Sequence, residues 1–176
     1  MRRIHAFILT AFVSLLLATG LANATDDAPL TASDIQRWAD TMQGIRQWAE
    51  DHSDRADALG DEGDFMAMQS FFADMQAANE AILQRHGFES QQEWNAIGNR
   101  IGQAYMALGM RDMLEQIESS LAEQPAEPDH PQQQMMREQM EQQITRMRAQ
   151  IDEVPKGDIE AVTAERETLE RVFSLD

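Results

Sequence analysis

Apolar residues recur at alternating steps of three and four in five segments of the chain, from residue 31 almost to its end. In the first segment Ile35, Trp38, Met42 and Ile45 follow this spacing, which places them on one face of a helix. The sequence contains no run of alternating β-branched residues, and no Asn-Gly or Asp-Gly pair that would join two strands. It therefore predicts an all-α fold, an antiparallel helical bundle of about three core helices plus a C-terminal helical hairpin.

The same spacing sets the expected helix positions. They lie near residues 31–53, 62–86, 91–122, 132–154 and 158–173. The sharpest boundary separates the second helix from the third. Gly87 followed by Phe88 suits a Schellman helix end, and Ser90 with Glu93 forms an S-x-x-E capping box. We therefore expect a tight helical hairpin at residues 86–91.

Two stretches predict connections instead of helices. Residues 50–64 combine seven acidic side chains with two glycines, which indicates a solvated turn. Residues 123–131 read EQPAEPDHP, and three prolines in nine positions are typical of a linker. We expect a helical bundle domain at 25–122, a Pro-rich linker at 123–131 and the C-terminal hairpin at 132–176.

The N-terminus has the pattern of a secretory signal peptide. Two arginines precede an apolar run from Ala6 to Leu21, and the tripeptide Ala22-Asn23-Ala24 forms an A-x-A cleavage site. The run of 16 residues is shorter than the roughly 20 that span a bilayer as a helix. We expect residues 1–24 to be cleaved, the mature protein to be periplasmic or extracellular, and no stable membrane insertion after cleavage.

Charge and composition exclude several function classes. The formal net charge is −17, with 31 acidic and 14 basic residues, and such a chain repels nucleic acids. The absence of cysteine excludes a disulfide framework, a thiolate metal site and thiol catalysis. The sequence also lacks HExxH, GxSxG, the P-loop and the glycine-rich dinucleotide fingerprint. We therefore expect a non-enzymatic protein without a cofactor.

What remains is a chaperone- or adaptor-like protein that binds another protein. Methionine-rich helical faces adapt to partners of different shape. Met140, Ile144, Met147 and Ile151 form a short coiled-coil seam in the segment 132–176, which carries less negative charge than the bundle. This seam is the predicted contact, either with a partner protein or in self-association of the hairpin.

In its methionine- and glutamine-rich composition the chain is similar to the small helical Spy and CpxP chaperone family of the bacterial envelope. That family carries an LTxxQ motif, whereas here Leu30-Thr31 is followed by glutamine only at Gln36, two residues too late. The motif does not match, so no residue role is transferred.

Metal handling is an alternative function. His130 is followed by Met135 and Met136, and thioether sulfurs with an imidazole suit the soft ion Cu(I). Most of the other methionines lie on or beside the apolar stripes, where methionine fills gaps in a core. Besides Met135 and Met136, only Met66 is expected to lie off these stripes.

A small apolar ligand held between helices is a further alternative. Gly98 and Gly102 lie one helical turn apart, with Trp94 and Tyr105 close to them in the sequence. Glycine costs a helix about 1 kcal/mol relative to alanine, so the pair indicates close approach of either a neighbouring helix or a ligand. Helix packing is the preferred interpretation.

Overall fold

The computed structural model describes residues 28–62, 65–122 and 131–174, and over these residues the chain forms helices and no strand. The helices are α2 (Ala32–Asp51), α3 (Ser53–Glu62), α4 (Phe65–Arg85), α5 (Gln91–Ala122), α6 (Pro131–Asp152), α7 (Lys156–Ala164) and α8 (Arg166–Phe173). The predicted all-α fold is confirmed. The predicted signal peptide at 1–24 and linker residues 123–130 lie outside the described residues.

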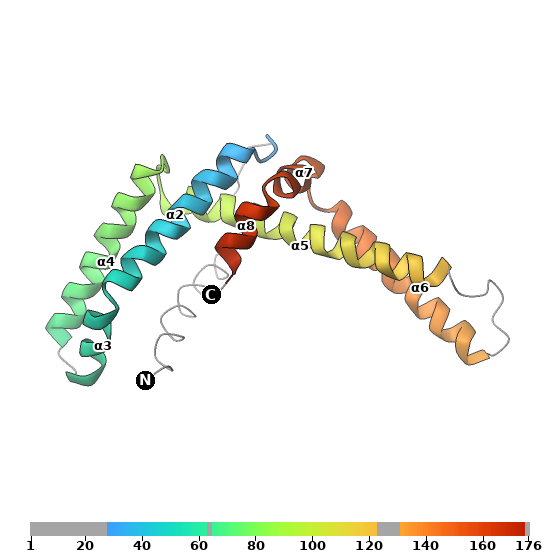
Figure 1. The fold of residues 1–176 in the computed structure, drawn as a ribbon, viewed down its shortest axis with the longest axis horizontal. Coiled ribbons are helices and arrows are strands. Elements are labelled where there is room, and N and C mark those ends of the chain that lie inside the picture. The colour runs from blue at the N-terminus through green and yellow to red at the C-terminus, as the bar shows by residue number, and fades with distance from the viewer. Residues whose placement is uncertain (1–27, 63–64, 123–130, 175–176) are drawn as a thin grey trace.

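The helices form an arch with two arms (Figure 1). One arm consists of α2 and α4, with α3 at its tip, and the other consists of α5 and α6. The short helices α7 and α8 cover the junction, where α7 contacts α5 and α2 while α8 contacts α2. The C-terminal segment, which the structure describes over residues 131–174, therefore contributes to both parts of the arch. None of the described helices is both long enough and apolar enough to cross a membrane.

The turn between α4 and α5 confirms the hairpin that was predicted at residues 86–91. Gly87 has a φ of 77°, and the N–H of Phe88 donates to the carbonyl oxygen of Leu83 at 2.9 Å, which is the long hydrogen bond of a Schellman motif. The backbone N–H of Glu93 donates to Ser90 Oγ at 3.1 Å and caps α5. The local signals in the sequence therefore predict this corner correctly.

Arg37 of α2 contacts the turn between α4 and α5. Its Nη1 donates to the carbonyl oxygen of Gly87 at 2.7 Å, and its Nη2 lies 3.3 Å from Glu93 Oε1. The guanidinium also lies over the ring of Phe88, 4.1 Å from the centroid. The contact joins α2 to the turn between α4 and α5.

The main hydrophobic cluster lies where the two arms meet. It draws on the start of the described chain and on α2, α4, α5, α7 and α8. Its buried members are Leu30, Ile35, Trp38, Ala39, Leu83, Phe88, Trp94, Ile101, Ala104, Ala107, Leu108, Ile159, Val162, Leu169 and Val172. Residues from both ends of the described chain thus share one core.

A second, smaller cluster lies along the arm formed by α5 and α6. Leu114 of α5 packs with Ile144 and Met147 of α6, and three partly buried residues surround them, namely Met110, Ile117 and Leu121. This cluster is separate from the main one. The outer half of α5 is therefore held by α6.

A buried carboxylate ties the first described residues to α5 and α7. Asp158 Oδ1 accepts hydrogen bonds from the backbone N–H of Leu30 and from Arg100 Nη2, each at 2.8 Å. Oδ2 accepts from Arg100 Nε at 2.9 Å, and Arg100 also donates to the carbonyl oxygen of Ala28. The two-pronged geometry and the backbone donor satisfy a carboxylate that is only 1% exposed. We call this set of contacts the Asp158 clamp.

The prediction of a solvated turn at residues 50–64 was wrong. Most of this stretch is helix α3, which begins at Ser53 directly after His52 ends α2. Alanine and leucine favour helix inside this segment, and the carboxylate of Asp54 in the first turn suits the positive end of the helix dipole. Acidic composition alone did not distinguish a charged helix from a turn.

The predicted single helix at 158–173 is divided in two. Glu165 has φ −104° and ψ 20°, which ends α7 and begins α8. Arg166, the residue that interrupts the apolar stripe, hydrogen bonds to Glu170 at 2.9 Å and reaches Asp112 of α5 at 3.1 Å. The hydrogen bond to Glu170 contributes most to raising the pKa of Arg166 above its ordinary value, and the hydrogen bond to Asp112 contributes next. The break lets α7 follow α5 while α8 follows α2.

Candidate functional site

Large apolar side chains are exposed on four helices. Those that are at least 40% exposed are Phe65, Met66, Met68 and Phe72 of α4, Met106 and Met113 of α5, Met135 and Met136 of α6, and Phe173 of α8. Groups of exposed apolar residues on a soluble surface mark interaction sites more often than single ones do.

The group on α4 belongs to the apolar stripe that the sequence shows. Phe65, Met68 and Phe72 follow steps of three and four and share one face, and Ile82 continues that stripe near the C-terminal end of the helix. Ile82 is buried, whereas Phe65 is 67% exposed. Figure 1 shows that α5 turns away from α4 after their hairpin, so α5 does not run beside the first half of α4.

An aromatic cluster supports the exposed part of α4 from its other side. The ring of Phe71 lies 5.8 Å from that of Trp48 in α2 and 6.3 Å from that of Phe72. Arg55 of α3 lies over Phe71, 5.4 Å from the ring centroid, and pairs with Asp74 at 2.7 Å. These contacts hold the helix in place while Phe72 itself stays exposed.

The group on α5 lies at the edge of the second cluster. Met106, Met110 and Met113 follow steps of four and three, and the middle residue packs against that cluster while the outer two are exposed. Nearby, Tyr105 contacts Phe173 of α8 edge to face, with ring centroids 5.2 Å apart. Apolar surface thus continues from α5 onto the end of α8.

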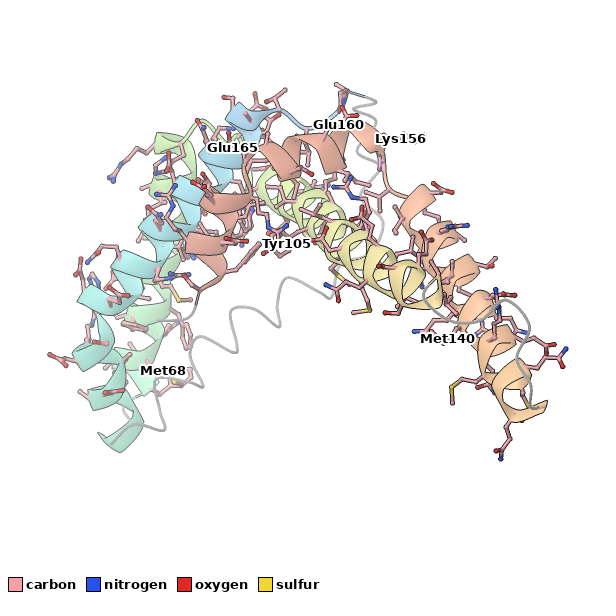
Figure 2. The ribbon with its side chains drawn as sticks, turned by 45° about the vertical axis from the view of Figure 1, so that its right-hand side comes forward. Met68, Tyr105, Met140, Lys156, Glu160 and Glu165 are labelled. Carbon is pink, nitrogen blue, oxygen red and sulfur yellow. The ribbon has the colours of Figure 1, made fainter. Side chains whose placement is uncertain are left out.

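Figure 2 shows how these surfaces relate to the arch. Toward its inner side lie the labelled residues Met68, Tyr105 and Met140. Toward its outer side lie Lys156, Glu160 and Glu165. The three labelled residues toward the inner side are thus uncharged, and the three toward the outer side are charged.

The predicted coiled-coil seam is occupied inside the molecule. Ile144 and Met147 are each 8% exposed and pack against Leu114 of α5. Met140 is half-buried, and Ile151 packs against the main cluster. The seam has the helical face that the sequence predicts, but α5 covers its central residues.

The predicted ligand site is filled at one of its two glycines. A Cβ at Gly98 would lie 2.6 Å from Trp38 Nε1, so the indole ring occupies the space beside this glycine. The rings of Trp38 and buried Trp94 stack with centroids 6.1 Å apart. Beside Gly102 a Cβ would meet no atom within 4 Å, and half-buried Tyr105 contacts α8 as described. At Gly98, helix packing is thus the explanation that the geometry favours.

The predicted copper ligands are not gathered together within the described residues. His130 lies outside these residues, and Met135 and Met136 are exposed in the first turns of α6. Neighbouring residues of a helix do not face one another, so these two thioethers point in different directions. Among the residues that the structure describes, no three His, Asp or Glu side chains are grouped as metal ligands.

The sequence analysis missed three exposed methionines. Met68, Met106 and Met113 were assigned to core stripes because their spacing is helical, yet their exposed fractions are 40%, 67% and 53%. The periodicity correctly places them on apolar faces but does not say whether another helix covers that part of the face.

Comparison with known proteins identified no matching protein family, curated protein or solved structure.

Proposed function

We propose that this chain is an exported, non-enzymatic helical protein that binds a partner protein through exposed apolar side chains of α4 and α5. The observation that carries the proposal is the continuous stripe of Phe65, Met68 and Phe72 on one exposed face of α4. Two further exposed methionines, Met106 and Met113, lie on α5.

Phe65 and Phe72 expose apolar surface that a partner would bury. Burying apolar surface gains about 25 cal/mol per Å², so a full phenylalanine side chain contributes on the order of 1.5–3 kcal/mol when a partner covers it. Phe65 and Phe72 do not obtain this gain within the described chain, since both are more than half exposed. A partner that covers both rings and Met68 would obtain it.

The chemistry of methionine also suits a protein-binding surface. Its unbranched thioether side chain adapts its shape at little cost, and surfaces rich in methionine accept partners that differ in detail. Such a surface supports an adaptor- or chaperone-like role better than a role with a single rigid ligand.

The signal-peptide pattern at 1–24 supports an exported location, and the net charge of −17 supports a protein partner over a nucleic acid.

The test is crosslinking and pull-down from the native envelope with a triple variant of α4. Replacing Phe65, Met68 and Phe72 by serine removes the apolar stripe, and we expect the captured partner to be lost. The matched control replaces Ala73, Ala77 and Gln84 by serine, which are exposed residues of the same helix that share a different face from the stripe, and it should retain the partner.

Two outcomes would contradict the proposal. Retention of the partner by the stripe variant would show that α4 does not contact it. Equal loss from the control variant would show that the serines act by weakening the helix. Circular dichroism of both variants separates the second outcome from true loss of the contact, because a weakened α4 lowers the helical signal.

A further inference from the structure

Methionine supplies all the sulfur in this chain, which has 12 methionines and no cysteine. Six of the methionines that the structure describes are at least 40% exposed, namely Met66, Met68, Met106, Met113, Met135 and Met136. We call them the six exposed methionines. By contrast, Met147 is 8% exposed and belongs to the second cluster.

We propose that the six exposed methionines are sites of reversible oxidation to methionine sulfoxide by peroxides, and that the folded chain takes up these oxygen atoms without unfolding. Susceptibility to this oxidation follows the exposure of the side chain. In a protein without cysteine, a peroxide finds no thiolate, and the accessible thioethers are the soft nucleophiles that remain.

The reaction balances with hydrogen peroxide as the oxidant. A lone pair of the thioether sulfur attacks one peroxide oxygen, the S–O bond forms as the O–O bond breaks, and the departing oxygen leaves as water after a proton transfer. The sulfur loses two electrons and the peroxide gains them. Sulfoxide reductases reverse the step with a dithiol as the reductant, which becomes a disulfide while the oxygen leaves as water.

The positions of the six sulfurs explain why the fold would survive. A sulfoxide is polar and disrupts a core in which it is buried. None of the six exposed methionines belongs to the main cluster or to the second cluster, whereas Met147 is a buried member and Met42 and Met110 pack against the clusters. Added oxygens at the six sites would therefore face solvent.

Oxidation would also change the surface that we assign to partner binding, a consequence that rests on the proposed function. Met68 lies between Phe65 and Phe72 on α4, and Met106 and Met113 form the exposed pair on α5. A sulfoxide at each of these positions replaces an apolar contact by a strong dipole. We therefore expect the oxidised protein to release its partner and the reduced protein to bind it again.

The first experiment measures oxidation alone. The purified full chain is treated with hydrogen peroxide, and peptide mass spectrometry follows each methionine while circular dichroism follows the helices. We expect each of the six exposed methionines to react at least about tenfold faster than Met147, because a buried thioether reacts only when the structure opens. A rate for Met147 equal to theirs, or loss of helix in step with their oxidation, would overturn the proposal.

The second experiment measures the effect on binding. A control variant carries leucine at Met66, Met135 and Met136, the exposed methionines that lie outside the proposed binding surface, and leucine keeps an apolar side chain of similar volume there. We expect peroxide to abolish partner capture by the original chain and by this variant alike, because Met68, Met106 and Met113 are still oxidised. Capture that persists after full oxidation of the original chain would overturn the control of binding. If the serine variant of α4 still captures the partner, the proposed binding surface itself is contradicted.

Discussion

Trp38 of α2 lies so close to Gly98 of α5 that a Cβ at position 98 would be 2.6 Å from its Nε1 atom. The indole cannot move aside easily, because it is 5% exposed and stacks on Trp94. The missing side chain of Gly98 is therefore what allows the two arms of the arch to approach each other at this point.

The first prediction uses the two glycines of α5 as a matched pair. Gly98→Ala should lower the free energy of unfolding, because the added methyl group overlaps the indole ring of Trp38. Gly102→Ala should raise it by up to about 1 kcal/mol, because the position is open and alanine favours helix. Urea denaturation measures both. Equal effects of the two substitutions would contradict the packing described at Gly98.

The second prediction concerns the Asp158 clamp. Arg100→Met leaves a buried carboxylate without its cation and should cost about 3–5 kcal/mol of unfolding free energy. Arg148→Met removes an exposed pair with Glu118 and should cost less than about 1 kcal/mol. Thermal and urea unfolding of the two variants test this difference. If Arg100→Met is as stable as Arg148→Met, the clamp does not stabilise the fold.

The third prediction separates the two clusters. Met147→Ala removes a buried side chain from the second cluster and should destabilise it by about 2–5 kcal/mol. We expect amide hydrogen exchange to become faster in α6 and in the outer half of α5, with little change in α2. Met135→Ala, at an exposed site on the same helix, should leave exchange unchanged. Faster exchange throughout the chain would mean that the clusters unfold as one unit.

The fourth prediction distinguishes surface from core among the phenylalanines. Phe72→Ala should change the unfolding free energy by no more than about 0.5–1 kcal/mol, because the ring is 53% exposed. Phe88→Ala should cost about 3–5 kcal/mol, because that ring is 2% exposed and lies beneath Arg37. Chemical denaturation compares them directly. A large loss for Phe72→Ala would show that its ring contributes to the folded core.

The sequence predicts local structure in this chain well. The hairpin at 86–91 could be predicted because its signals involve only residues close together in the sequence. Gly87 ends one helix with a left-handed backbone conformation, and the side chain of Ser90 caps the next helix. The start of α2 is equally local, since Thr31 and Asp34 cap each other reciprocally. Such signals need no knowledge of distant neighbours.

What the sequence could not predict depends on distant neighbours. The stripe on α4 is apolar from Phe65 to Ile82, but only the position of α5 decides which end of it is buried. The seam of Ile144 and Met147 was identified as an apolar face, yet its occupant, Leu114, lies thirty or more residues away on another helix. Periodicity defines which side of a helix is apolar and leaves the identity of the covering helix open.

The hydrogen bond between the backbone of Leu30 and Asp158 spans nearly the whole described chain. A chain that emerges from a ribosome or a membrane pore with its N-terminus first presents Leu30 long before Asp158 becomes available. Since α7 and α8 also complete the packing around α2, the junction of the arch stays open during emergence. Final closure therefore waits for the last helices, and an incomplete chain would remain accessible to proteases until then.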